Sequence, residues 1–163
     1  MKLSIALALA SLSFGATAGL PTSDQDFVTT AGQGGLAEVA LGKLASQQGT
    51  SAAVKTFAQQ MVSDHSKANA GLKAAAEKAQ ADVPSAPSED QQATLTHLKG
   101  LQGAEFDKAY ADAMVKDHKA TIELFEKEAS KGDSGPIKTF ASTTLPTLKH
   151  HLQMAESLGE NTK

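Results

Sequence analysis

The side chains best suited to chemistry in this sequence lie in a short repeat. The pentapeptide Met-Val-Ser-Asp-His at residues 61–65 recurs as Met-Val-Lys-Asp-His at residues 114–118. Both copies fall inside long helical patterns, and helix interiors rarely carry an ionisable pair without a packing or ligand reason. The repeat therefore marks a candidate site, although it does not specify a reaction.

Further polar residues join this site if the helical stretches pack as a bundle. His151 lies on the apolar stripe of the last stretch, and Glu38 lies on the inner face of the first. Within each predicted hairpin, one polar residue lies on each helix. Their distances from the hairpin turn differ by about five residues, or about 7–8 Å along a helix. The predicted inward-facing set is Glu38, Asp64, His65, Asp117, His118 and His151. Which of Asp117 and His118 points further inward stays open.

Two interpretations of this set stay open. Converging imidazoles and carboxylates are typical ligands of a transition metal, with copper, zinc or iron as the candidates. Met61, Met114 and Met154 each lie one turn from a His, which would suit copper, although Met is also an ordinary core residue. Alternatively, Asp-His pairs hydrogen-bond across helices and fix their register without a ligand. The sequence offers no convincing nucleophilic catalytic site or nucleotide motif.

The elements that must position these residues are helices. Apolar residues recur at helical spacing through nearly the whole chain, which predicts an all-α protein. The segment Gly-Gln-Gly-Gly at residues 32–35 predicts a close helix contact or a kink, and Pro146 predicts a kink in the last helix. We expect a short helix over residues 89–99 and long helices over residues 22–48, 51–81, 104–130 and 134–159.

Turn signals group these helices into two hairpins. Gly49 and Gly132 close short turns, and the proline-containing segment over residues 82–103 can serve as the crossover between the hairpins. The prediction is a four-helix bundle in a single domain over residues 19–163, with the short helix in the crossover. His97 and His150 are expected near the surface. A solvated acidic face is predicted for Glu123, Glu126 and Glu128.

The first 18 residues have the features of a secretory signal peptide. Lys2 is followed by an apolar run and by Ala16-Thr17-Ala18, a typical cleavage site before Gly19. We therefore expect an exported protein, cleaved after Ala18. The chain carries a net charge of −3, which argues against a nucleic acid partner, and it has no Cys, which excludes disulfides and thiolate metal sites.

Several motifs resemble those of the bacterial family known as domain of unknown function 4142. They lie at residues 34–39, 42–45, 57–69, 106–110, 114–118 and 145–152. The resemblance covers the chain from Asp26 to about Leu158. It implies a ferritin-like four-helix bundle exported to the periplasm or outer membrane. We expect a periplasmic protein, or one that associates peripherally with the outer membrane or with other envelope proteins.

The wider ferritin-like class suggests di-iron chemistry, but the required motifs are missing. Such bundles use Glu-x-x-His on two helices, whereas Val62 and Leu148 lie three residues before His65 and His151. We therefore expect a non-enzymatic bundle protein. Its inward cluster either holds a transition metal or fixes helix register in a structural, interaction or stress-associated protein.

Overall fold

The computed structural model describes residues 20–161, so the predicted signal peptide lies outside the described residues. The described chain forms helices and no strand, which confirms the all-α prediction. The helices are α1 (Thr22–Gln48), α2 (Ala52–Ala79), α3 (Glu89–Lys99), α4 (Gly103–Lys131) and α5 (Gly135–Asn161). Their ends lie within about three residues of the predicted ones.

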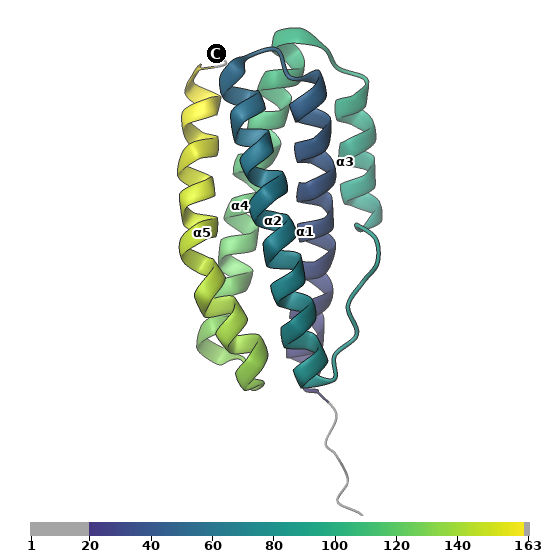
Figure 1. Ribbon diagram of the computed structural model, residues 1–163, viewed down its shortest axis with the longest axis vertical. Helices are drawn as coiled ribbons and strands as arrows, with labels where there is room; N and C mark the ends of the chain where they lie inside the picture. The colour runs from purple at the N-terminus through teal and green to yellow at the C-terminus, as the bar shows by residue number, and fades with distance from the viewer. Residues whose placement is uncertain (1–19, 162–163) are drawn as a thin grey trace, which may run out of the picture.

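The four long helices form the predicted bundle of two antiparallel α-hairpins. Helix α1 pairs with α2, and α4 pairs with α5, while α2 lies beside α5 and α1 beside α4 (Figure 1). The crossover between the hairpins runs up the outside of the bundle and carries α3, which packs along α1. The four long helices therefore enclose the core, and α3 adds to one outer face.

Two buried aspartates tie each hairpin to the turn of the other. Asp107, in the first turns of α4, accepts hydrogen bonds from the backbone N–H groups of Thr50 (2.9 Å) and Ser51 (2.8 Å), just before α2. Asp24, at the start of α1, accepts bonds from the corresponding groups of Asp133 (3.3 Å) and Ser134 (2.6 Å), just before α5. Because a helix N-terminus leaves N–H groups without helical partners, these carboxylates stabilise both α2 and α5 and fix how the hairpins meet.

The glycine-rich segment of α1 remains a single helix and makes the close contacts that the sequence predicted. A Cβ atom on Gly32 would lie 2.7 Å from Cγ of Pro84, and one on Gly35 would lie 1.9 Å from Oδ1 of Asn69. The missing side chains therefore let the crossover and α2 approach α1. Helix α5 also continues through Pro146, and its lower half leans away from its upper half in Figure 1.

The core is divided into two apolar clusters at different depths. The upper cluster, towards the turn between α1 and α2, includes Leu41, Phe57, Phe106, Tyr110 and Met114. The lower cluster, towards the turn between α4 and α5, includes Phe27, Leu72, Ile122, Phe125 and Leu148. The polar residues Glu38, His65, His118 and His151 fall between the two groups along their helices.

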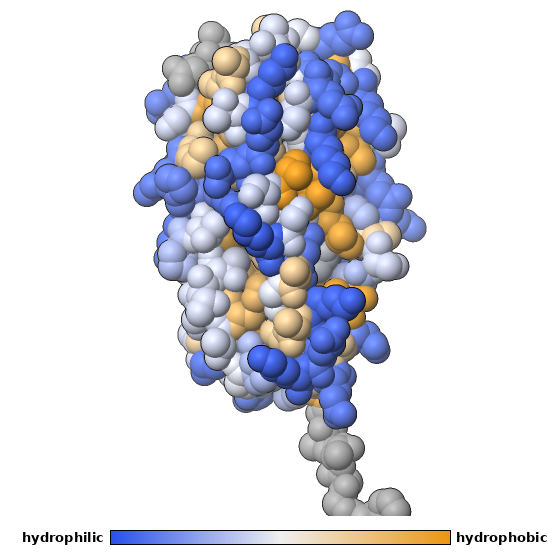
Figure 2. All heavy atoms as spheres, viewed as in Figure 1, coloured by the Kyte–Doolittle hydropathy of each residue, from blue (hydrophilic) through white to orange (hydrophobic). Residues whose placement is uncertain are grey.

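The face of the molecule shown in Figure 2 is dominated by hydrophilic side chains, with smaller apolar areas between them. This distribution follows from the amphipathic pattern of the helices, whose apolar stripes face the core. No helix within residues 20–161 combines the length and the apolar character needed to cross a membrane.

A pair of glycine substitutions tests the contact between α1 and α2. A Cβ atom on Gly42 would lie 2.9 Å from both the carbonyl oxygen of Ala58 and Cγ2 of Val62, whereas one on Gly34 would meet only Nε2 of Gln91 at 3.8 Å. Gly42→Ala should lower the free energy of unfolding, because overpacking costs about 1–3 kcal/mol. Gly34→Ala should raise it by up to about 1 kcal/mol through helix propensity. Urea unfolding measures both, and equal effects at the two positions would contradict the close approach.

Candidate metal centre

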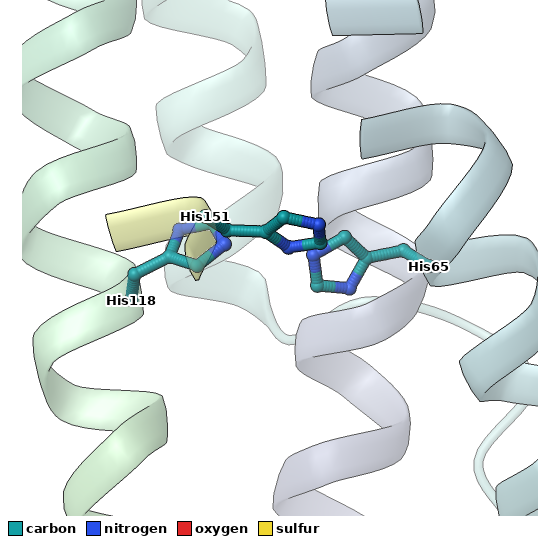
Figure 3. Close-up of side chains that lie close together, drawn as sticks. All are labelled: His65, His118 and His151. Atoms are coloured by element: carbon teal, nitrogen blue, oxygen red, sulfur yellow. The ribbon is translucent and has the colours of Figure 1, made fainter. Parts of the chain in front are cut away.

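Three buried histidines from three helices meet in the layer between the two apolar clusters. His65 comes from α2, His118 from α4 and His151 from α5, and their side chains point towards one another (Figure 3). The ring centroids lie 5.3–5.6 Å apart. One ring nitrogen from each lies within 4.8 Å of the other two. The predicted convergence of the three imidazoles is therefore present in the structure.

Hydrogen bonds at the outer edge of the layer orient two of the rings. Nδ1 of His118 donates to the carbonyl oxygen of Met114 at 2.9 Å. Nε2 of His151 donates to Oδ2 of Asp64 at 3.1 Å. Since a neutral imidazole has one N–H group, Nε2 of His118 and Nδ1 of His151 keep a free lone pair. Outer partners of this kind commonly orient histidines that bind metals.

The inner nitrogens have no hydrogen-bond partner among the described residues. This holds for Nε2 of His65, Nε2 of His118 and Nδ1 of His151. The three side chains are 6%, 1% and 1% exposed, so each of these nitrogens is shielded from solvent. Buried polar atoms are usually paired, and leaving one unpaired costs about 1–3 kcal/mol. Three such atoms in one layer therefore form an arrangement that a shared cation would satisfy.

Burial also keeps the rings neutral. It lowers the pKa of His65 to about 3, and the adjacent His118 and His151 add to that effect. Burial lowers the pKa of His118 to about 4, although the bond to Met114 acts in the opposite direction. Burial lowers the pKa of His151 as well, partly offset by Asp64. Neutral imidazole is the form that coordinates a metal ion.

Glu38 lies beside this layer on α1. Its Oε1 is 3.8 Å from Nδ1 of His118, its side chain is buried, and its Oε2 has no partner among the described residues. Burial raises the pKa of Glu38 to about 8, with a further contribution from Asp117. The carboxyl group is therefore protonated at neutral pH, and it can donate a hydrogen bond or, after losing its proton, bind a cation.

The two aspartates of the repeat differ in position. Asp64 is half-buried, accepts bonds from His151 and from Gln60 (2.5 Å), and pairs with Lys67 at 3.6 Å. Asp117 is also half-buried and does not belong to the set of converging nitrogens, so His118 is the member of its pair that points inward. Burial raises the pKa of Asp117. Asp64 acts on the layer through His151, whereas Asp117 faces a neighbouring cavity.

That cavity extends from the histidine layer into the lower half of the bundle. It has a volume of about 370 Å³ and is lined by His65, Glu38 and Asp117 together with apolar residues that include Leu72 and Phe125. The sequence pattern did not predict it, because a cavity depends on how side chains from several helices fill the space between them.

The remaining predicted polar residues are placed as follows. His97 and His150 are exposed, as expected. Glu128 is buried at 5% exposure, so its assignment to a solvated face is wrong. Its position three residues after the buried Phe125 places it on the inner face of α4, and this spacing could have identified it.

Met61 and Met114 pack in the upper apolar cluster, with Met154 against it. Met114 contributes its backbone carbonyl to the layer.

The fold and the site together define a four-helix bundle with a buried histidine layer. The chain matches the family described as "Domain of unknown function (DUF4142)" over residues 9–158, and it therefore belongs to that family. The crystal structure of a DUF305 fragment from Deinococcus radiodurans is similar, with a TM-score of 0.74 and 13% sequence identity. The similarity covers 88% of this chain and 99% of that chain, and it shows the fold alone. None of the curated proteins compared with the chain matches it significantly.

The raised pKa of Glu38 predicts how the stability of the metal-free protein depends on pH. Its folded pKa of about 8 lies above the ordinary value of 4.5, so the folded state holds a proton that the unfolded chain has lost. The free energy of unfolding should therefore fall as the pH rises from about 6.5 to 8, with a slope of at most about 1.4 kcal/mol per pH unit from this group. Glu38→Gln should make the slope shallower.

Urea unfolding at several pH values between 6.5 and 8 measures this slope. Glu123→Gln, which alters an exposed acid of α4, serves as the control and should leave the slope unchanged. A slope in Glu38→Gln equal to that of the unaltered protein would contradict the protonated state of Glu38.

Proposed function

We propose that this protein is an exported, metal-binding bundle of the bacterial envelope, and that it holds one transition metal ion through His65, His118 and His151. The observation that carries this proposal is the convergence of three buried ring nitrogens within 4.8 Å of one another. The outer bonds from His118 and His151 support it further, since they leave a lone pair on the inner nitrogen of each ring.

The distances are compatible with a metal ion after small side-chain movements. Bonds of about 2.0–2.1 Å in a tetrahedral site place two imidazole nitrogens about 3.4 Å apart. The nitrogens lie no more than 4.8 Å apart, so the rings need to close by no more than about 1.5 Å to reach this separation. Three protein ligands would leave a further coordination position for Glu38, water or a small ligand.

The chemistry of the ligands favours zinc or copper, with iron as a further candidate. Imidazole suits all three metals, and the chain has no Cys to supply a softer ligand. The charge of a divalent ion would be balanced by Asp64, which bonds His151, and by Glu38 after proton loss. The pattern of residues 1–18 supports export, because it has the features of a secretory signal peptide.

A structural role for the layer is the second candidate. The bond between His151 and Asp64 crosses from α5 to α2, and such a bond specifies how two helices align. Under this interpretation the layer aligns the hairpins of an interaction protein and takes up no metal. The two candidates differ in what happens to the ring nitrogens that face the centre. A metal ion would bind these nitrogens, whereas a purely structural layer leaves them unpaired.

Metal analysis of the purified protein separates these candidates. The protein would be purified from the periplasmic fraction without chelators or a His-tag, and its metal content measured by elemental mass spectrometry. We expect about one zinc, copper or iron ion per chain. His65→Ala with His118→Ala should abolish it, because each substitution removes a ligand.

The matched control is His97→Ala with His150→Ala, which removes two exposed histidines and should leave the metal content unchanged. Circular dichroism would establish that both double variants remain helical. A protein that carries no metal and takes up neither Zn²⁺ nor Cu²⁺ on titration would contradict the proposal and favour the structural role.

A further inference from the structure

The cavity below the histidine layer lies among the four long helices, and its walls include surface positions on α1 and α4. Thr30 and Ala120, both exposed, lie on those two helices, and Asp117 is half-buried beside Ala120. His65 and Glu38, both buried, line the same cavity. One continuous space therefore joins the surface of the bundle to a histidine of the proposed metal centre.

The ionisable groups along this space favour a cation. Its lining contains the carboxyl groups of Asp117 and Glu38 and the imidazole of His65, and it contains no Lys. Glu38 is only 7% exposed, and its Oε2 has no partner among the described residues. A buried, unpaired carboxyl oxygen in a cavity that also reaches a histidine is a site that a cation can use as a step on its way inward.

Small residues keep this space open. Gly34 and Gly35 lie on α1, Ala68 lies on α2 and Ala120 lies on α4, all in the lining. A Cβ atom on Gly34 would meet only Nε2 of Gln91, at 3.8 Å, so a side chain can begin there without moving the backbone. Position 34 is therefore a place where the cavity can be narrowed without altering a proposed ligand.

The opposite side of the layer is less suited to the entry of a cation. Asp64 lies there between α2 and α5, but its carboxylate already accepts bonds from His151 and Gln60. The ammonium group of Lys67 lies 3.6 Å from Oδ1 of Asp64, and Lys67 lines the surface hollow on that side. A metal ion at Asp64 would therefore be repelled by Lys67 at close range, whereas Lys116 acts on Asp117 without forming an ion pair with it.

We infer that the cavity is the route by which the metal ion reaches the three histidines, with Asp117 capturing it near the surface and Glu38 passing it to His65. This inference rests on the proposed function. A residue that only assists entry changes the rates of association and dissociation equally, so it leaves the dissociation constant unchanged. A ligand of the bound ion would instead change the dissociation constant.

Stopped-flow absorption with Co²⁺, whose visible bands report its coordination, tests the route in the full mature chain. Asp117→Asn should slow association and dissociation together, by up to about tenfold, and weaken the dependence of the association rate on ionic strength, since charges of one sign that line a cleft together raise association rates by about 10–10³. Gly34→Leu should slow association and dissociation together. In both variants the dissociation constant should stay within about a factor of two of the unaltered value.

The controls are Glu123→Gln, which removes an exposed acid of α4 outside the cavity, and Gly34→Ala, which changes helix propensity at position 34 with little narrowing. Both should bind at the unaltered rate.

If Asp117→Asn raises the dissociation constant at an unchanged association rate, the route is overturned and Asp117 is a ligand. Unchanged rates in both Asp117→Asn and Gly34→Leu overturn the route while the metal centre stands. If the unaltered protein binds no Co²⁺, Zn²⁺ or Cu²⁺ at all, the proposed function itself fails. Asp117→Asn alone decides the test if Gly34→Leu loses its helical circular dichroism.

Discussion

The burial of three neutral imidazoles in one layer between two apolar clusters is the constraint around which this bundle is organised. An imidazole in the core must place its N–H group against an acceptor, and here the carbonyl of Met114 and the carboxylate of Asp64 take that role for two of the rings. Once these outer bonds form, the lone pairs of both rings face inward, towards His65. The geometry that supports a metal centre thus follows from satisfying the N–H groups at the outer edge.

The layer can form only if three helices bring their histidines to the same depth. The buried aspartates Asp24 and Asp107 contribute to this alignment, because each joins the first turns of one hairpin to the turn of the other. The apolar clusters above and below then exclude water, which keeps the rings neutral and the electrostatic interactions within the layer strong. The alignment of the hairpins, the neutrality of the histidines and the proposed ligand set are therefore linked.

Much of the fold could be predicted from the sequence, because helical periodicity and turn residues are local signals. The end of α1 followed from Gly49 and the two ends of α3 followed from Ser88 and Gly100. The depth of His65, His118 and His151 followed from counting residues along each hairpin. The inward choice of His118 over Asp117 could not be predicted, since neighbouring helix positions differ by about 100° and both border the stripe. It depends on how α4 is rotated against α1 and α5.

Other features depend on contacts between distant segments, which a linear pattern does not contain. The buried role of Asp107 requires the turn before α2, more than 50 residues earlier in the chain. The run of acids around Glu128 predicts an exposed side chain, although its spacing from Phe125 places it inside. The cavity beside His65 arises where small residues of α1, α2 and α4 face one another. Each of these features needed the packed helices to become visible.

The most direct test of the metal centre is X-ray absorption spectroscopy of the protein loaded with one equivalent of Zn²⁺ or Cu²⁺. We predict a first shell that contains three imidazole nitrogens at about 2.0–2.1 Å, with the outer-ring scattering that imidazole produces. His65→Ala should lower the imidazole count by one. A first shell made of oxygen alone, or an imidazole count that His65→Ala leaves unchanged, would contradict the central claim that these three buried histidines bind the metal.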